Sequence, residues 1–217
     1  SLRRIRILAG EVGGGEEPLI ALAVRGRRSP ALLHVAAAHP ARAGHHADLV
    51  FPNIHGISPE DGRLFIVGIG PLGGGWGAKS REDGVSVTVC INDGDTHNSP
   101  TEQLEAKYPV LVESYKIRED SGGAGEYRGG LGAEMVVQAL SPFSVTTRID
   151  RMHCKPWGLE GGGEAAGNGI AIRRKTGWQT DLPNAKIFNV RLERGDAYKM
   201  LSGGGGLNST TEDYFRF

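Results

Sequence analysis

Glycine most constrains what this sequence can fold into, because it gathers in dense clusters instead of being spread along the chain. The clusters lie at residues 13–15, 73–77, 122–132, 161–163 and 203–206. The chain has 34 glycines in 217 residues, more than twice the usual share of about 7%. Glycine weakens helices and strands, and these clusters follow no collagen-like period. They therefore predict loops that turn sharply or approach other backbone closely, between short strands.

The stretch His97–Gly132 combines the largest cluster with a helix signal. Ser99 is a favourable N-cap residue, Pro100 suits the first helical position, and Glu102 stands three residues after the cap. This pattern predicts a capping box. Pro109 cannot continue a helix, so the predicted helix has about two turns.

A strand and then a loop are predicted after this helix. Val110–Ile117 has apolar residues on both faces, which is typical of a buried strand. Asp120–Gly132 contains six glycines, a density that no regular element tolerates. This segment is therefore predicted to be a loop whose backbone approaches a ligand or another segment closely.

Short strands dominate the rest of the predicted fold. Period-two or β-branched runs bounded by turn signals predict strands at residues 19–24, 63–69, 85–91, 133–140, 143–149, 170–174, 186–192 and 198–201. A second helix is predicted over about 30–38, and residues 41–62 are predicted to form a loop. Ser141-Pro142 predicts a hairpin between its flanking strands. The expected fold class is α+β and β-rich, with mostly antiparallel sheets, few short helices and many glycine-rich loops.

Charge and cysteine content narrow the function classes. Lysine plus arginine equals aspartate plus glutamate at 25 each, so the net charge is zero. Nucleic-acid binders are usually basic, so no nucleic-acid partner is expected. No run of about 18 apolar residues predicts a membrane span. Cys90 and Cys154 give no disulfide framework, so a reducing compartment, the cytoplasm, is expected.

One segment resembles a phosphate-binding loop without completing its pattern. Gly73–Ser80 follows a predicted strand and ends in Lys-Ser, but Ala78 replaces the glycine before the lysine. A phosphate loop also opens a helix, whereas a strand is predicted to follow here. The sequence therefore argues against nucleotide binding by this segment.

Two histidine-containing segments have metal-ligand residue types. His45, His46 and Asp48 suit zinc, manganese or iron, but adjacent histidines in an extended chain point to opposite faces. A solvated loop is the better interpretation. His153 and Cys154 lack further ligands at zinc spacing, so a buried thiol beside a surface imidazole is expected. No metal site is assigned.

Charged residues beside the glycine loop are stronger candidates for chemistry. Asp120, Glu126, Arg128 and Arg151 lie in or near it. A carboxylate can orient a nucleophile, and an arginine can bind a carboxylate in two places. A structural ion pair that pins the loop explains the same residues equally well. The run Gly203–Gly206 suits either close ligand contact or a loose tail.

Several of these motifs occur together, in one order, in a known family. The chain carries GGGWGA, then NSPTEQLEAKYPVLVESYKIREDSGGAGEYRGGLG, then DRMHCKPWGLEGG and LSGGGG. These blocks resemble the C-terminal part of the hydantoinase B/5-oxoprolinase family, which includes the larger subunits of acetone and acetophenone carboxylases. The resemblance extends from about Asp61 to Gly206. Residues 1–60 match poorly, and 207–217 form an atypical tail.

The resemblance implies an ATP-dependent enzyme that opens a cyclic amide. Expected reactions are conversion of 5-oxoproline to glutamate or of a hydantoin to its carbamoyl acid. ATP with Mg is expected on a hydantoinase A-like partner subunit or domain, and a divalent metal in the N-terminal half that longer members have. Alternatives are a subunit of a ketone carboxylase of the acetone or acetophenone type, or a non-catalytic structural or docking fragment.

Residue type and the family motif together assign roles in and near the central stretch. Asp120, Arg128 and Arg151 are expected to be catalytic groups around the substrate. Asn98 is expected to supply an amide hydrogen bond. Three glycines are expected to let the backbone approach the ligand: Gly122, Gly123 and Gly125.

Overall fold

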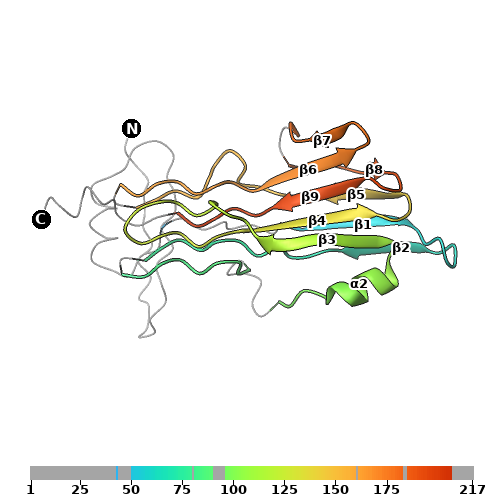
Figure 1. Ribbon diagram of the computed structural model, residues 1–217, viewed down its shortest axis with the longest axis horizontal. Coiled ribbons are helices and arrows are strands. Elements are labelled where there is room, and N and C mark those ends of the chain that lie inside the picture. Colours follow the sequence, from blue (N-terminus) through green and yellow to red (C-terminus); the bar gives the residue numbers. More distant parts are fainter. Residues whose placement is uncertain are drawn as a thin grey trace, which may run out of the picture.

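The chain folds into two antiparallel β-sheets with one α-helix among the described residues (Figure 1). The computed structural model describes residues 43, 50–79, 81–89, 96–159, 161–182 and 185–206. One sheet has the order β2-β1-β5-β8, formed by Leu64–Gly68, Pro52–Ile57, Phe143–Thr147 and Val190–Leu192. The other has the order β3-β4-β9-β6-β7, formed by Val110–Ile117, Ala133–Ala139, Ala197–Leu201, Gly169–Arg174 and Gly177–Gln179. The predicted β-rich fold class is confirmed.

A single hydrophobic core joins the two sheets. Strands of both sheets contribute buried residues to it, as in β-sandwiches, although all three residues of β7 are exposed. In β5, Phe143 and Val145 are buried while Ser144 and Thr146 are more exposed. The core cluster also contains Ile54, Val137, Ile172, Leu192, Tyr198 and Met200, which come from both sheets. The sheets therefore pack face to face.

Helix α2 spans Thr101–Lys107, and the capping-box prediction for it is wrong. The N-cap residue is Pro100, which has an extended ψ of 140° and no side chain able to cap the helix. The helix therefore starts one residue later than predicted, and Glu102 has no cap partner. The predicted end is correct, because Tyr108 before Pro109 is already extended.

Strand β3 has the predicted bounds but not the predicted burial. It is an edge strand of its sheet, so its side chains have a neighbouring strand on one side only. Leu111 is 39% exposed and Ile117 is 52% exposed. A register shift between Val112 and Ser114 also bends the strand. The apolar run was consistent with burial, but the position at the sheet edge decides the exposure.

Other strand predictions failed because strand partners are chosen in three dimensions. The strands around Ser141-Pro142 exist, but β4 and β5 lie in different sheets, so the predicted hairpin is wrong. The predicted loop 41–62 contains β1, and the unpredicted β7 follows β6. Strand β8 is shorter than the predicted 186–192. Predictions at residues 19–24 and 30–38 lie outside the described residues.

The glycine clusters at 73–77, 122–132 and 203–206 assemble beyond one end of the two sheets (Figure 1). We call segments 73–79, 84–88, 120–132 and 203–206 the glycine bundle. Segment 73–79 is hydrogen-bonded to three others: Gly74 to Thr88, Gly75 to Gly203, and Trp76 to Gly130. A strand in a flat sheet has only two neighbours, so this assembly is a bundle of extended chains.

The bundle also explains the failed strand prediction at 85–91. In the described part, this segment makes one isolated bridge, between Thr88 and Gly74. Val87 has a φ of 49°, which interrupts the pleat of a strand. The segment therefore belongs to the bundle instead of to either sheet.

Candidate functional site

The glycine loop, which is predicted to approach a ligand or another segment closely, contacts other backbone of the bundle. The Gly123 N–H donates to the Gly205 carbonyl at 2.9 Å. A Cβ atom on Gly122 would lie 2.3 Å from the Gly129 carbonyl oxygen. Gly125 is half-buried in the same loop. Gly122 and Gly123 thus lie close to other protein backbone, and the predicted ligand contacts of Gly122, Gly123 and Gly125 stay predictions.

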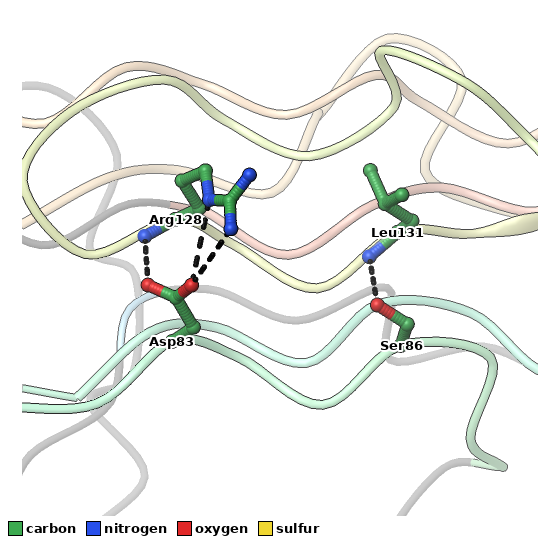
Figure 2. A network of polar contacts seen from close by, with 4 residues as sticks. All are labelled: Asp83, Ser86, Arg128 and Leu131. Carbon is green, nitrogen blue, oxygen red and sulfur yellow. Dashed lines mark hydrogen bonds and ion pairs between the residues drawn. The ribbon is translucent and has the colours of Figure 1, made fainter.

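The carboxylate of Asp83, directly before bundle segment 84–88, binds Arg128 (Figure 2). Asp83 accepts the Arg128 backbone N–H at 2.7 Å and the guanidinium Nε and Nη2 at 3.4 and 3.3 Å. Further along each segment, the Leu131 N–H donates to the Ser86 hydroxyl at 2.9 Å. Both charged side chains are largely exposed, so the ion pair itself contributes little. The contacts join segments 83–86 and 128–131.

The three predicted catalytic residues differ in exposure and in their polar partners. Asp120 is exposed and Arg151 is half-buried, and each has a φ of 53°. The Arg151 carbonyl accepts the Asn168 N–H at 3.2 Å. Within the part of the chain that is described, no hydrogen bond or ion pair links Asp120, Arg128 and Arg151. Their predicted catalytic roles stay predictions.

Sequence reasoning overlooked Arg118, which connects the bundle to the sheets. Its Nη1 donates to the carbonyls of Gly167 and Ser202 at 2.8 and 3.0 Å. Burial lowers the pKa of the Arg118 guanidinium, and the charge of Glu134 opposes that shift. The Ser121 hydroxyl donates to the Arg118 carbonyl at 2.6 Å. No local pattern marks Arg118, because its partners are 49 and 84 residues away.

The segment that resembles a phosphate loop has its backbone donors occupied. The N–H groups of Gly74, Gly75 and Trp76 donate to carbonyls of other bundle segments. The Lys79 ammonium pairs with Glu82 at 2.5 Å. Described residues 81–89 form no helix. The segment therefore does not fit a nucleotide phosphate.

The described residues contain no group of three or more His, Cys, Asp and Glu side chains that could hold a metal. His45, His46 and Asp48 lie outside those residues. Cys154 is an exposed free thiol, so the predicted buried thiol is wrong. It lies in the exposed segment 153–155, outside the core.

A cavity of about 150 Å³ lies beside the start of α2. One wall is segment 68–72 at the end of β2, and another is Asn98–Thr101. Leu104, Tyr115 and Met135 complete the lining, and none of these described residues is charged. The predicted ligand residue Asn98 therefore lies in a cavity, although none of the predicted catalytic residues lines it.

The polar centre of the cavity is a hydrogen bond that joins the segment before α2 to β3. Asn98 Nδ2 donates to the Tyr115 hydroxyl at 3.4 Å. Burial raises the pKa of Tyr115, and the Asn98 hydrogen bond partly offsets this. The phenol therefore stays protonated at neutral pH. Sequence reasoning placed Tyr115 on a strand without giving it a role, because its contact with Asn98 depends on how α2 folds back.

A side chain of the helix, Glu105, holds it in this position. Glu105 Oε1 accepts the Val112 backbone N–H of β3 at 2.7 Å. Leu104 is buried against the core, and Tyr108 contacts the Phe65 ring of β2 at 5.7 Å between centroids. The cavity wall is thus fixed to both sheets.

Comparison with known proteins gives a family match over most of the chain. The model described as Hydantoinase B/oxoprolinase matches residues 28–207. A putative D-/L-hydantoinase subunit of a Pseudomonas species is 28% identical over 64% of this chain and 24% of its own length. The 5-oxoprolinase PfmaA of Pestalotiopsis fici is 39% identical over 42% of this chain and 7% of its own length. The chain thus spans a quarter or less of these relatives.

Two solved structures share the fold. An ATP-dependent caprolactamase from Pseudomonas jessenii has a TM-score of 0.67 at 20% identity, over 83% of this chain and 32% of its own. Nucleotide-free acetone carboxylase has a TM-score of 0.62 at 20% identity, over 78% of this chain and 26% of its own. No helix of the described residues is long and apolar enough to cross a membrane.

Proposed function

The chain belongs to the Hydantoinase B/oxoprolinase family, and on this basis we propose that it is part of an ATP-dependent cyclic-amide hydrolase. The proposed reaction opens the ring of 5-oxoproline or a hydantoin with concurrent hydrolysis of ATP. The observation that carries the proposal is the family match over residues 28–207. Relatives named as a 5-oxoprolinase and as a putative D-/L-hydantoinase subunit support it.

The chemistry requires activation of a poor electrophile. An amide carbonyl resists water, but transfer of the γ-phosphoryl group of ATP to the amide oxygen creates a good leaving group. Water then attacks the carbon and the ring C–N bond breaks, so that the nitrogen leaves as the amine and the carbonyl carbon becomes an acyl phosphate. A second water hydrolyses the acyl phosphate to the carboxylate and free phosphate. Arginines and backbone N–H groups would stabilise the negative charge that develops.

ATP with Mg is proposed to bind a hydantoinase A-like partner subunit or domain. The described part of this chain supports that division of labour, because the Gly74–Trp76 donors are occupied and Lys79 is paired with Glu82. The relatives described as subunits also support an assembly of several chains. This chain would then contribute substrate contacts.

Asp120, Arg128 and Arg151 remain the proposed catalytic groups, with Asn98 as a substrate contact. For Arg128 to reach a substrate, its guanidinium must leave Asp83. Both side chains are exposed, so this exchange costs about 1 kcal/mol or less. The Arg128 backbone contact can persist while the side chain moves.

The test measures phosphate release by this chain mixed with a hydantoinase A-type partner, with and without 5-oxoproline or hydantoin. Substrate-stimulated phosphate release with formation of the ring-opened acid supports the proposal. Arg128→Ala should then reduce turnover, whereas Lys155→Ala, which changes an exposed cation outside the bundle, should not. Partner binding without any turnover would contradict the enzymatic role.

Two alternatives have specific support. The TM-score of 0.62 with acetone carboxylase keeps a ketone carboxylase subunit open at the level of fold. The occupation of Arg128, Gly122 and Gly123 by contacts within the bundle favours a structural or docking role. Bicarbonate-dependent ATP hydrolysis with acetone would identify the first, and ligand-free partner binding alone would identify the second.

A further inference from the structure

The cavity beside α2 combines uncharged polar groups with apolar side chains, and its polar lining includes Ser99 and Thr101 besides the hydrogen-bonded pair described next. The pair is Asn98 and Tyr115, from two segments that meet at the cavity. The apolar surface comes from Leu72, Leu104 and Met135. A few converging polar groups in a largely apolar concavity are the usual composition of a small-molecule site.

The polar pair leaves one donor and one acceptor for a ligand. The Tyr115 oxygen accepts from Asn98 Nδ2, so the phenolic hydrogen is free to donate elsewhere. The Asn98 Oδ1 receives no hydrogen bond from the residues that the structure describes. Because the two side chains are hydrogen-bonded to each other, the free donor and the free acceptor lie next to each other.

This arrangement matches an amide inside a small ring. The ring forces the amide to be cis, so its C=O and N–H groups lie on the same side. An open-chain secondary amide is strongly trans and presents these groups on opposite sides. Adjacent donor and acceptor groups can therefore bind both atoms of a cyclic amide at once, but only one atom of an open-chain amide.

The volume of the cavity and the lack of charge in its described lining further limit the class of ligand. The cavity volume is about 150 Å³, and an apolar protein cavity of about 150 Å³ holds a benzene-sized ring. Among the described residues, no lysine, arginine or histidine lines the cavity. A carboxylate placed there would gain no cationic partner from this lining in exchange for the hydration it gives up.

We propose that this cavity binds a neutral cyclic amide, a lactam or hydantoin ring without a carboxylate. The ring C=O accepts from the Tyr115 hydroxyl, and the ring N–H donates to Asn98 Oδ1. The choice of cyclic amides rests on the proposed function. The cavity adds a location and a preference for neutral rings over 5-oxoproline.

The test uses the full ¹⁵N-labelled chain without ATP or partner. NMR titration with δ-valerolactam or hydantoin should shift backbone amides of segments 68–72 and 98–101, with a Kd on the order of 1 mM for so small a ligand. N-propylacetamide, the open-chain amide with as many heavy atoms as the lactam, should bind at least fivefold more weakly. 5-Oxoproline should likewise bind at least fivefold more weakly than its neutral carboxamide. Equal binding of cyclic and open-chain amides would overturn the proposal.

Two variants locate the binding groups. Tyr115→Phe and Asn98→Leu should each weaken lactam binding at least threefold, while Tyr108→Phe, a tyrosine outside the cavity lining, should leave it unchanged. Unchanged affinity of Tyr115→Phe would refute the assignment. Lactam binding here without ATP-coupled turnover in the partner assay would contradict only the proposed function. Turnover that is unchanged in Tyr115→Phe would contradict only the proposal that the cyclic amide binds in this cavity.

Discussion

Replacing Gly205 by alanine tests whether the glycine bundle depends on the absence of side chains. An alanine Cβ at this position would lie 1.8 Å from the Trp76 carbonyl oxygen and 2.2 Å from its carbon. Real Cβ contacts essentially never fall below 3.0 Å, so the two segments must move apart until that contact lengthens from 1.8 Å to at least 3.0 Å. The obstructing atoms are backbone, which cannot rotate away as a side chain can.

This separation breaks the hydrogen bonds that pass through Gly205. Its N–H donates to the Gly130 carbonyl at 2.8 Å, and its own carbonyl accepts from the Gly123 N–H at 2.9 Å. Each unsatisfied buried group costs about 1–3 kcal/mol. Loss of both bonds therefore lowers the free energy of unfolding by about 2–6 kcal/mol, a large part of a typical 5–15 kcal/mol.

Thermal and urea unfolding followed by circular dichroism measure this loss. For a chain of this size, about 4 kcal/mol corresponds to a fall in Tm of about 8–16 °C. The control is Gly169→Ala in β6, where the new Cβ would meet only Leu201 side-chain atoms at 3.6 and 3.8 Å. If Gly205→Ala were as stable as Gly169→Ala within about 0.5 kcal/mol, the account of the bundle would be refuted.

Three further perturbations test other contacts. Arg118→Met should lower the free energy of unfolding by about 2–3 kcal/mol, because it leaves two half-buried carbonyls without their charged donor; urea unfolding measures this. Glu105→Ala should lower the free energy of unfolding by about 1–2 kcal/mol, because it removes the acceptor for the β3 backbone N–H. Glu102→Ala should lower it by less than about 0.5 kcal/mol, and equal losses in the two variants would contradict the contact assigned to Glu105. Spectrophotometric titration, compared with Tyr115→Phe, should show Tyr115 ionising above pH 10.0. Because its folded pKa is raised, its contribution to stability is complete below pH 10.0 and is lost as pH rises through the folded pKa; ionisation at or below 10.0 would contradict its burial.

The sequence by itself determined the features that depend on neighbouring residues. Pro109 ended the helix where predicted, because proline restricts the backbone before it and removes a donor. Strand β3 has the predicted bounds, Val110–Ile117, between that proline and the glycine loop. The order of motifs also indicated the family that the match over residues 28–207 shows. These features need no knowledge of distant partners.

Only the tertiary structure decided which distant segments meet. Asp83 and Arg128 are 45 residues apart in sequence, and the local pattern of neither residue points to the other. The chain between β4 and β5 crosses from one sheet to the other instead of forming a hairpin, because both inner faces gain burial in a shared core. Asn98 meets Tyr115 for a similar reason, since buried Leu104 holds α2 against β3. Apolar side chains are buried and polar groups find hydrogen-bond partners only in the complete fold. The local sequence limits only which backbone conformations each segment can adopt.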